Sequence, residues 1–123
     1  MAITYTTAVK NSRLNAVVTA IGTTGVLEIG TAGMASVLAT IPLANPAGTV
    51  SSGVLTFTTA GMSDTSADAS GTAAAARIRT ASGGTDIIIG LTVGTTGTDI
   101  VLDNTSINSG QTVTISSASI THA

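Results

Sequence analysis

The sequence predicts a mainly β protein, either an antiparallel β-sandwich or a distorted barrel, with one N-terminal α-helix. Apolar residues recur with a period of two in several short stretches after residue 25, and Gly-rich turns separate these stretches. Helical spacing appears only before residue 22. The 43% of hydrophobic residues include one Phe, one Tyr and no Trp, so small aliphatic side chains must fill the core. We expect a single domain over 1–123, with an extended arm at 1–7, a helix at 8–22 and strands within 25–121.

The predicted helix comes from the segment TTAVKNSRLNAVVTAIG, residues 6–22. Apolar residues recur along it at helical spacing: Leu14, Val17 or Val18, and Ile21. Thr6 or Thr7 can cap its first turn, and Gly22 can adopt the left-handed conformation that ends a helix. One face is therefore apolar, and we expect the helix to lie against the sheet and cover one opening of the barrel.

The first two strand candidates follow this helix. In GVLEIG, Leu27 and Ile29 lie on one face with Glu28 between them. The second, SVLATIPLA, alternates Val37, Ala39, Ile41 and Leu43. Pro42 and Pro46 interfere with continued pairing there, which is typical of an edge strand.

Three further stretches alternate in the same way. GVLTFTTAG places Leu55 and Phe57 on one face. The segments TDIVLD and TVTISSASIT are the other two candidates. Inward-facing residues in the last of them are Val113, Ile115 and Ile120.

The stretch TAAAARIRTASGGTDIIIG, residues 72–90, admits two interpretations. Four consecutive alanines, Ala73–Ala76, favour a helix, but so short a helix gains little because nucleation is costly. TASGGT then forms a turn, and apolar residues alternate after it: Ile87, Ile89, Leu91 and Val93. We therefore predict that 72–80 is the first arm of a β-hairpin whose alanines allow close packing; a helix is the alternative.

The composition restricts the classes of function. Only 8% of residues are charged and the formal net charge is −2, so polar uncharged residues cover most of the surface. A free monomeric domain usually carries more charge, which suggests that part of this surface contacts other protein. The four cations, Lys10, Arg13, Arg77 and Arg79, are too few for a nucleic-acid-binding face. No apolar run has the ~18 residues of a membrane span.

The sequence indicates no catalytic, cofactor or metal site. Asp64 and Asp68 could offer oxygen ligands, but the spacing of a calcium loop is absent and a polar surface loop is the better interpretation. Asp99 and Asp103 are about 13 Å apart along a strand, too far for a catalytic pair. His122 is the sole histidine, and the sequence contains no nucleophile motif that it could activate. Asn104 begins an Asn-Thr-Ser triplet, the pattern of an N-glycosylation acceptor, which often arises by chance.

Three residues are candidates for contacts with a partner. Arg77 and Arg79 place two guanidinium groups on one strand face, where they either lie in solvent or pair with carboxylates of a partner subunit. Tyr5 lies in the uncharged arm at 1–7, which is easily ordered on a partner; a strand edge is the alternative contact. We expect that deleting the residues before Ala8 abolishes partner binding without unfolding the domain.

Nearly the whole chain resembles a group of small structural proteins of tailed bacteriophages and prophages. The resemblance rests on three segments: TTAVKNSRLNAVVTAIGTTGVLEIG; LATIPLANPAG with GVLTF; and SDTSADASGTAAAARI followed by GLTVGTTGTDIVLDNTSINSGQTVTISSASITHA. It implies a virion component, and among such components we favour a capsid decoration, or cement, protein. Such proteins are β-rich, often trimeric, and bind the outer capsid surface between capsomers, with the major capsid protein as partner.

Other functions remain as alternatives. A tail, head–tail connector or head-fibre component is the nearest. A carbohydrate-binding or adhesin-like β-sandwich is more remote, because sugar platforms normally use aromatic side chains and this chain has two aromatic residues. Ice binding would suit the many threonines, but they show no regular repeat. An enzyme is the least favoured class.

Overall fold

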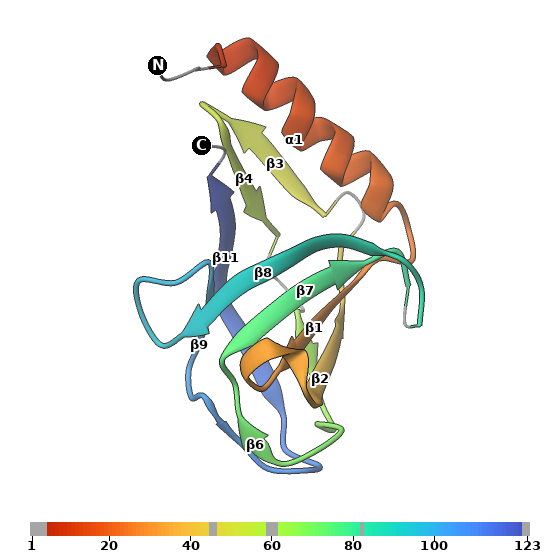
Figure 1. The fold of residues 1–123 in the computed structure, drawn as a ribbon, viewed down its shortest axis with the longest axis vertical. Helices are drawn as coiled ribbons and strands as arrows, with labels where there is room; N and C mark the ends of the chain where they lie inside the picture. Colours follow the sequence, from red (N-terminus) through yellow and green to blue (C-terminus); the bar gives the residue numbers. More distant parts are fainter. Residues whose placement is uncertain (1–4, 45–46, 59–61, 82, 122–123) are drawn as a thin grey trace.

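The structure is a computed structural model that describes residues 5–44, 47–58, 62–81 and 83–121. It contains one α-helix, one short 3-10 helix and eleven strands within these residues (Figure 1). The elements are α1 (Thr7–Ile21), β1 (Val26–Gly30), η1 (Ala32–Met34), β2 (Val37–Pro42), β3 (Gly48–Ser51), β4 (Val54–Phe57), β5 (Ser63–Asp64), β6 (Gly71–Thr72), β7 (Ala75–Arg79), β8 (Asp86–Gly94), β9 (Ile100–Leu102), β10 (Ser106–Ile107) and β11 (Val113–Thr121).

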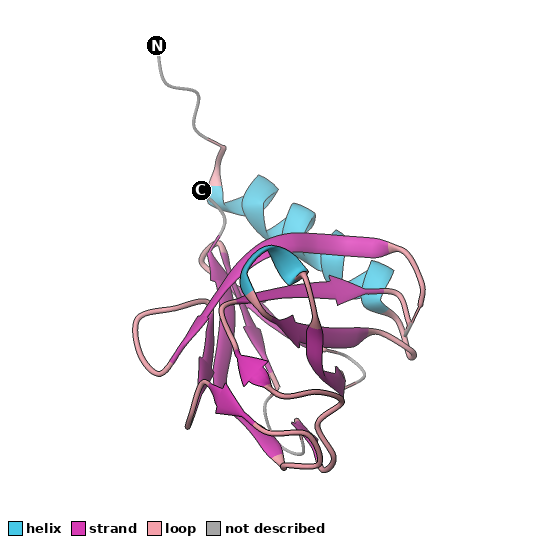
Figure 2. Ribbon diagram, turned by 60° about the horizontal axis from the view of Figure 1, so that its bottom comes forward, coloured by secondary structure: helices cyan, strands magenta, loops and turns pink. Residues whose placement is uncertain are grey.

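Nine strands form one curled sheet in the order β2-β1-β7-β8-β9-β11-β4-β3, with β5 paired to β11. Strands β6 and β10 form a separate two-stranded sheet. The large sheet curls into a half-barrel, so the prediction of a β-rich fold with one N-terminal helix is confirmed (Figure 2). Of the two architectures predicted, the distorted barrel is the nearer one.

The sheet is mixed rather than wholly antiparallel, because β8 and β9 pair in parallel through Val93 with Ile100 and Gly94 with Val101. A loop between these strands turns the chain back before it resumes the same direction. Asp99 holds this loop: its Oδ2 accepts hydrogen bonds from the backbone N–H and the hydroxyl of Thr92, both at 3.0 Å. The sequence pattern gives strand positions but not strand direction.

The helix is confirmed and begins at Thr7, one residue before the predicted start. The Thr6 hydroxyl caps it by accepting a hydrogen bond from Val9 N–H at 3.4 Å, and Gly22 ends it at φ 59°. Leu14 and Ile21 are buried on its inner face. The helix lies across the β3–β4 hairpin and reaches β8, so it covers one end of the half-barrel (Figure 1).

The alanine segment forms a hairpin, and the helical alternative is wrong. Strand β7 pairs antiparallel with β8 on one side and with β1 on the other. Ala76 is fully buried between these neighbours, as expected for the close packing of a small side chain. Sheet pairing on both sides therefore outweighs the intrinsic helix preference of a few alanines.

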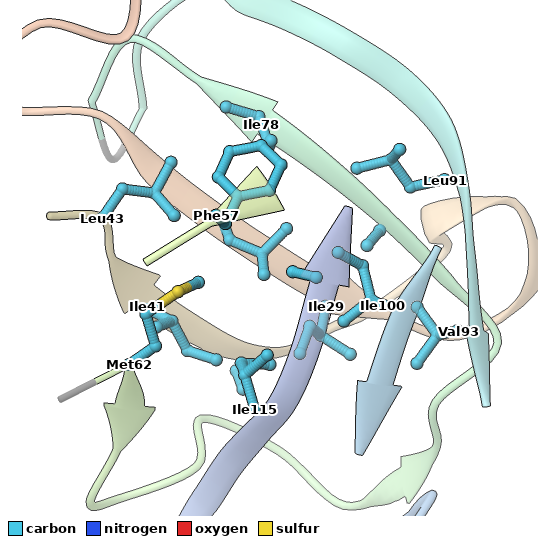
Figure 3. Close-up of a cluster of buried hydrophobic side chains, with 14 of the residues drawn as sticks. Ile29, Ile41, Leu43, Phe57, Met62, Ile78, Leu91, Val93, Ile100 and Ile115 are labelled. Atoms are coloured by element: carbon cyan, nitrogen blue, oxygen red, sulfur yellow. The ribbon is translucent and has the colours of Figure 1, made fainter. Parts of the chain in front are cut away.

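The core is aliphatic and surrounds a single aromatic ring, that of Phe57 (Figure 3). Most residues predicted to face inward are buried, and those at 9% exposure or less are Leu27, Ile29, Ala39, Ile41, Leu43, Leu55, Phe57, Leu91, Val93, Val113 and Ile115. Ile120 packs against the core while partly exposed. A register shift after Ile115 in β11 moves the inward position to Ala118.

The prediction that Ile89 faces inward is wrong, because its side chain is 69% exposed. Strand β8 bulges here: Ala76 pairs with Leu91, but Ile78 pairs with Ile88, so one extra residue of β8 lies between the two pairs. Gly90 adopts φ 76°, which suits glycine best. The alternation therefore changes phase at Gly90 and turns Ile89 outward.

Candidate interaction surface

The outer face of β1, β7 and β8 carries a cluster of four charged residues: Glu28, Arg77, Arg79 and Asp86. The register pairs Glu28 with Arg77 and Val26 with Arg79, so the two arginines share one face as predicted. Glu28 lies in an apolar strand and is only 5% exposed. A buried carboxylate requires a charged or hydrogen-bonding partner, and the two arginines supply it.

Each arginine is held by a carboxylate of its own chain. Arg77 Nε donates a hydrogen bond to Glu28 Oε1 at 2.6 Å, and Arg79 Nη1 lies 3.7 Å from the same oxygen. Arg79 Nη2 donates to the Gly84 carbonyl at 2.6 Å. Its Nε is 3.0 Å from Asp86 Oδ1, an ion-pair distance, although the N–H does not point at that oxygen.

These contacts change the interpretation of the arginine pair. Sequence reasoning considered solvent or a partner's carboxylates, whereas Glu28 and Asp86 occupy that role within the chain. A charge within an apolar strand is the signal that could have pointed to Glu28, since such a residue must be paired when buried. A role for Arg77 or Arg79 in partner binding stays a prediction.

An open groove of about 450 Å³ lies beside this cluster. Its lining is mainly apolar or backbone: Gly33, Met34, Ala74, Ala75, Arg77, Ile89, Gly90, Leu91 and Thr92. These residues come from β7 and the residue before it, from β8 and from η1, the orange turn in Figure 1. Ile89 projects at the β8 border as the most exposed large hydrophobic residue of the described chain.

Two features shape the groove. Met34 adopts φ 56°, and its side chain lies over Gly30, where a Cβ would come within 3.0 Å of the sulfur. Arg77 uses its Nε for Glu28, and the described residues provide no hydrogen-bond partner for its terminal Nη groups. The groove therefore combines apolar walls with guanidinium donors that have no acceptor among the described residues.

Tyr5 lies at the start of α1, with its ring centroid 4.5 Å from the Arg13 guanidinium carbon. It is 44% exposed, and Val9, one turn further along, is 43% exposed. The expected arm at 1–7 is thus shorter: Thr6 is the N-cap and Thr7 is helical. Residues 1–4 lie outside the described residues. Removing everything before Ala8 would also delete the cap.

Asp64 and Asp68 bind the edge of β2. Thr40 N–H donates to Asp64 Oδ2 at 3.0 Å, and the Thr40 hydroxyl donates to Asp68 Oδ2 at 3.1 Å. Asp68 N–H donates to the Leu38 carbonyl at 2.7 Å. Strand β2 ends the sheet, as expected for a strand that contains Pro42, and Asp64 of β5, with Asp68 of the following loop, blocks addition of another strand there. Pro46 lies outside the described residues.

The remaining polar candidates have local roles where the structure describes them. Asp99 and Asp103 flank β9 as predicted, and Asn104 Oδ1 accepts a hydrogen bond from Ser106 N–H at 2.9 Å. His122 lies outside the described residues. Over the described chain, no group of three or more His, Cys, Asp or Glu side chains could hold a metal ion, and no helix has the length and apolar character to cross a membrane.

A scan against protein-family models, a search of curated proteins and a search of solved structures each found no match to this chain.

Proposed function

We propose that this chain is a structural protein of a tailed-bacteriophage or prophage virion, and specifically a capsid decoration protein that binds the outer capsid surface between capsomers. The sequence resemblance suggests this function. One structural observation supports it: large apolar side chains, Tyr5, Val9 and Ile89, are exposed on a surface with few charges. Exposed apolar groups on a weakly charged surface are typical of protein contacts.

The start of α1 is the surface we assign to the capsid. Tyr5 and Val9 present apolar area, and Arg13 holds the Tyr5 ring against the helix, which reduces the entropy lost on binding. These side chains cover only part of the about 1,600 Å² of a stable interface. Residues 1–4 and neighbouring loops would supply the rest.

The major capsid protein is the proposed partner, and stabilisation of the shell against the pressure of packaged DNA is the proposed role. Many equivalent sites on a shell increase avidity when subunits are joined, so an oligomer, with a trimer favoured, is part of the proposal. A tail, connector or head-fibre component remains the alternative within the virion.

Co-sedimentation with emptied capsids of the encoding phage tests this function. We expect the wild-type chain to pellet with the shells and to saturate at a fixed ratio to the major capsid protein. Truncation of residues 1–4, which retains the Thr6 cap, should abolish binding, and Tyr5→Ala should weaken it at least about tenfold through lost apolar contact. Ser12→Ala, a change at an exposed position of α1, is the control.

Wild-type chain that stays in the supernatant at every shell concentration would contradict the decoration function. Undiminished binding by the truncated chain would exclude residues 1–4 as the contact. Circular dichroism of each variant verifies that the fold is intact.

A further inference from the structure

We propose that two copies of this chain associate through the groove, with Ile89 of each copy seated in the groove of the other. This self-association is independent of the capsid function. The exposed Ile89 side chain lies on the same surface as the groove, whose lining includes Met34 and Ala75. A surface that carries both halves of a contact is self-complementary about a two-fold axis, because residue i then meets j and j meets i.

The exposure of Ile89 is built into the backbone. The bulge at Gly90 turns Ile89 out of the core and leaves it 69% exposed, whereas Leu91 returns to 6%. Bulges re-aim particular side chains and are structural features rather than defects. An isolated isoleucine at the surface needs no explanation, but this one is placed at the rim of an apolar groove.

Most of β8 also lacks a second strand partner within the described residues. Between Asp86 and Thr92, β8 pairs with β7 on one side, and within the described chain β9 pairs with it only at Val93 and Gly94. Natural proteins block exposed edges with charged residues, as Asp64 does at β2. The only charged residue of β8, Asp86, is at its far end beside Arg79.

Charge complementarity also favours a second copy. Arg77 lines the groove, and among the described residues its Nη groups have no hydrogen-bond partner. Asp86, whose side chain is 45% exposed, lies on the same strand as Ile89. In the proposed two-fold contact, the Arg77 donors of each copy would face the exposed Asp86 carboxylate of the other copy. Each copy thus supplies one donor group, Arg77, and one acceptor group, Asp86, to the contact.

Analytical ultracentrifugation over about 1–200 µM chain tests the proposal, since weak specific dimers dissociate in this range. We expect the wild-type chain to form a two-fold assembly and Ile89→Lys to halve its mass. The unit released is a monomer, or a trimer if another face of the protein holds three chains together. The dissociation constant should rise about a hundredfold, with about tenfold from each of two isoleucines. Ala16→Lys, which adds the same charge at an exposed position of α1 outside the groove, is the matched control and should not change the mass.

A crosslinking experiment separates this geometry from other contacts. The chain has no cysteine, so Ala75→Cys and Ile89→Cys chains can be mixed and oxidised with diamide without background. We expect a disulfide between an Ala75→Cys chain and an Ile89→Cys chain, formed faster than either homodimer. Ala75→Leu should block association by filling the groove.

Three results would overturn the proposal: a wild-type chain that stays monomeric at about 200 µM, an assembly whose mass Ile89→Lys leaves unchanged, or preferential crosslinking within either single-cysteine sample. None of these results bears on capsid binding, which shell co-sedimentation measures separately.

Discussion

Replacing Arg77 should destabilise the protein more than replacing Glu28, although both changes break the same ion pair. The Glu28 side chain is 7% exposed and the Arg77 side chain 24%. Arg77→Met leaves a carboxylate buried with one remaining cation, Arg79, at 3.7 Å. Stranding a buried charge costs about 3–5 kcal/mol, and the remaining contact places the loss near the lower value, about 3 kcal/mol.

Glu28→Met should cost less, about 1 kcal/mol, because the partly exposed guanidinium of Arg77 can turn to water once its partner is gone. The double variant Glu28→Met/Arg77→Met strands neither group and should also lose about 1 kcal/mol. The coupling between the two sites is then about 3 kcal/mol. For a chain of this size, Arg77→Met should lower the Tm by about 10–15 °C.

Urea unfolding followed by circular dichroism measures these free energies, since the chain has no Trp to report by fluorescence. Arg13→Met, a change to an exposed arginine outside the cluster, is the control; it removes the contact with the Tyr5 ring and should lower the free energy of unfolding by at most about 0.5–1 kcal/mol. Equal losses for Glu28→Met and Arg77→Met, or strictly additive losses in the double variant, would refute the assignment of Glu28 as the buried charge of the cluster.

Three further predictions concern the sheet edge, two strand glycines and the core, and the same unfolding assay measures each. Asp64→Ala should lower the free energy of unfolding by about 1–2 kcal/mol and promote aggregation, because the Thr40 amide of β2 loses its acceptor. Asp103→Ala, which removes no such contact, is the control and should be neutral. Equal effects of the two variants would contradict the capping role of Asp64. Gly48→Ala should cost about 3 kcal/mol because a Cβ there overlaps the backbone of β4. Gly90→Ala has open space and should cost only about 1 kcal/mol for its positive φ, so the reverse ranking would be evidence against the packing described. Ala76→Leu should lower the free energy of unfolding by about 1–3 kcal/mol, because Ala76 is fully buried and a larger side chain would overpack the core there. A neutral result would contradict close packing around Ala76.

The sequence predicted those features that depend on neighbouring residues. The helix follows from the spacing of Leu14 and Ile21 with a Thr cap and a Gly stop, and the structure confirms each of these. Leu55 and Phe57 face inward because alternation alone decides the face of a regular strand. The hairpin at 72–90 also followed from local reasoning, namely the cost of nucleating a short helix.

The features that depend on distant residues could not be predicted. Ile89 fits a regular inward alternation, and only the register against β7 reveals the extra residue in β8. The pairing of Glu28 with Arg77 joins residues 49 positions apart. Asp64 resembles a surface or cation-binding residue in the sequence, and it becomes an edge cap only because β2 ends the sheet beside it.

The candidate surface was predicted in part. Tyr5 is exposed as a contact residue would be, although it belongs to the start of α1 rather than to a free arm. Arg77 borders the groove, but its first partner is intramolecular. The groove itself has no signal in the sequence, since η1, β7 and β8 meet only in the folded chain.

The copy number of this polypeptide in purified virions of the encoding phage or prophage tests the proposed function most directly. Quantitative mass spectrometry against the major capsid protein provides it. The decoration function predicts a number of copies comparable to that of the major capsid protein. A handful of copies per particle would instead assign the chain to the tail or connector, and its absence from the particle would contradict a structural role in the virion.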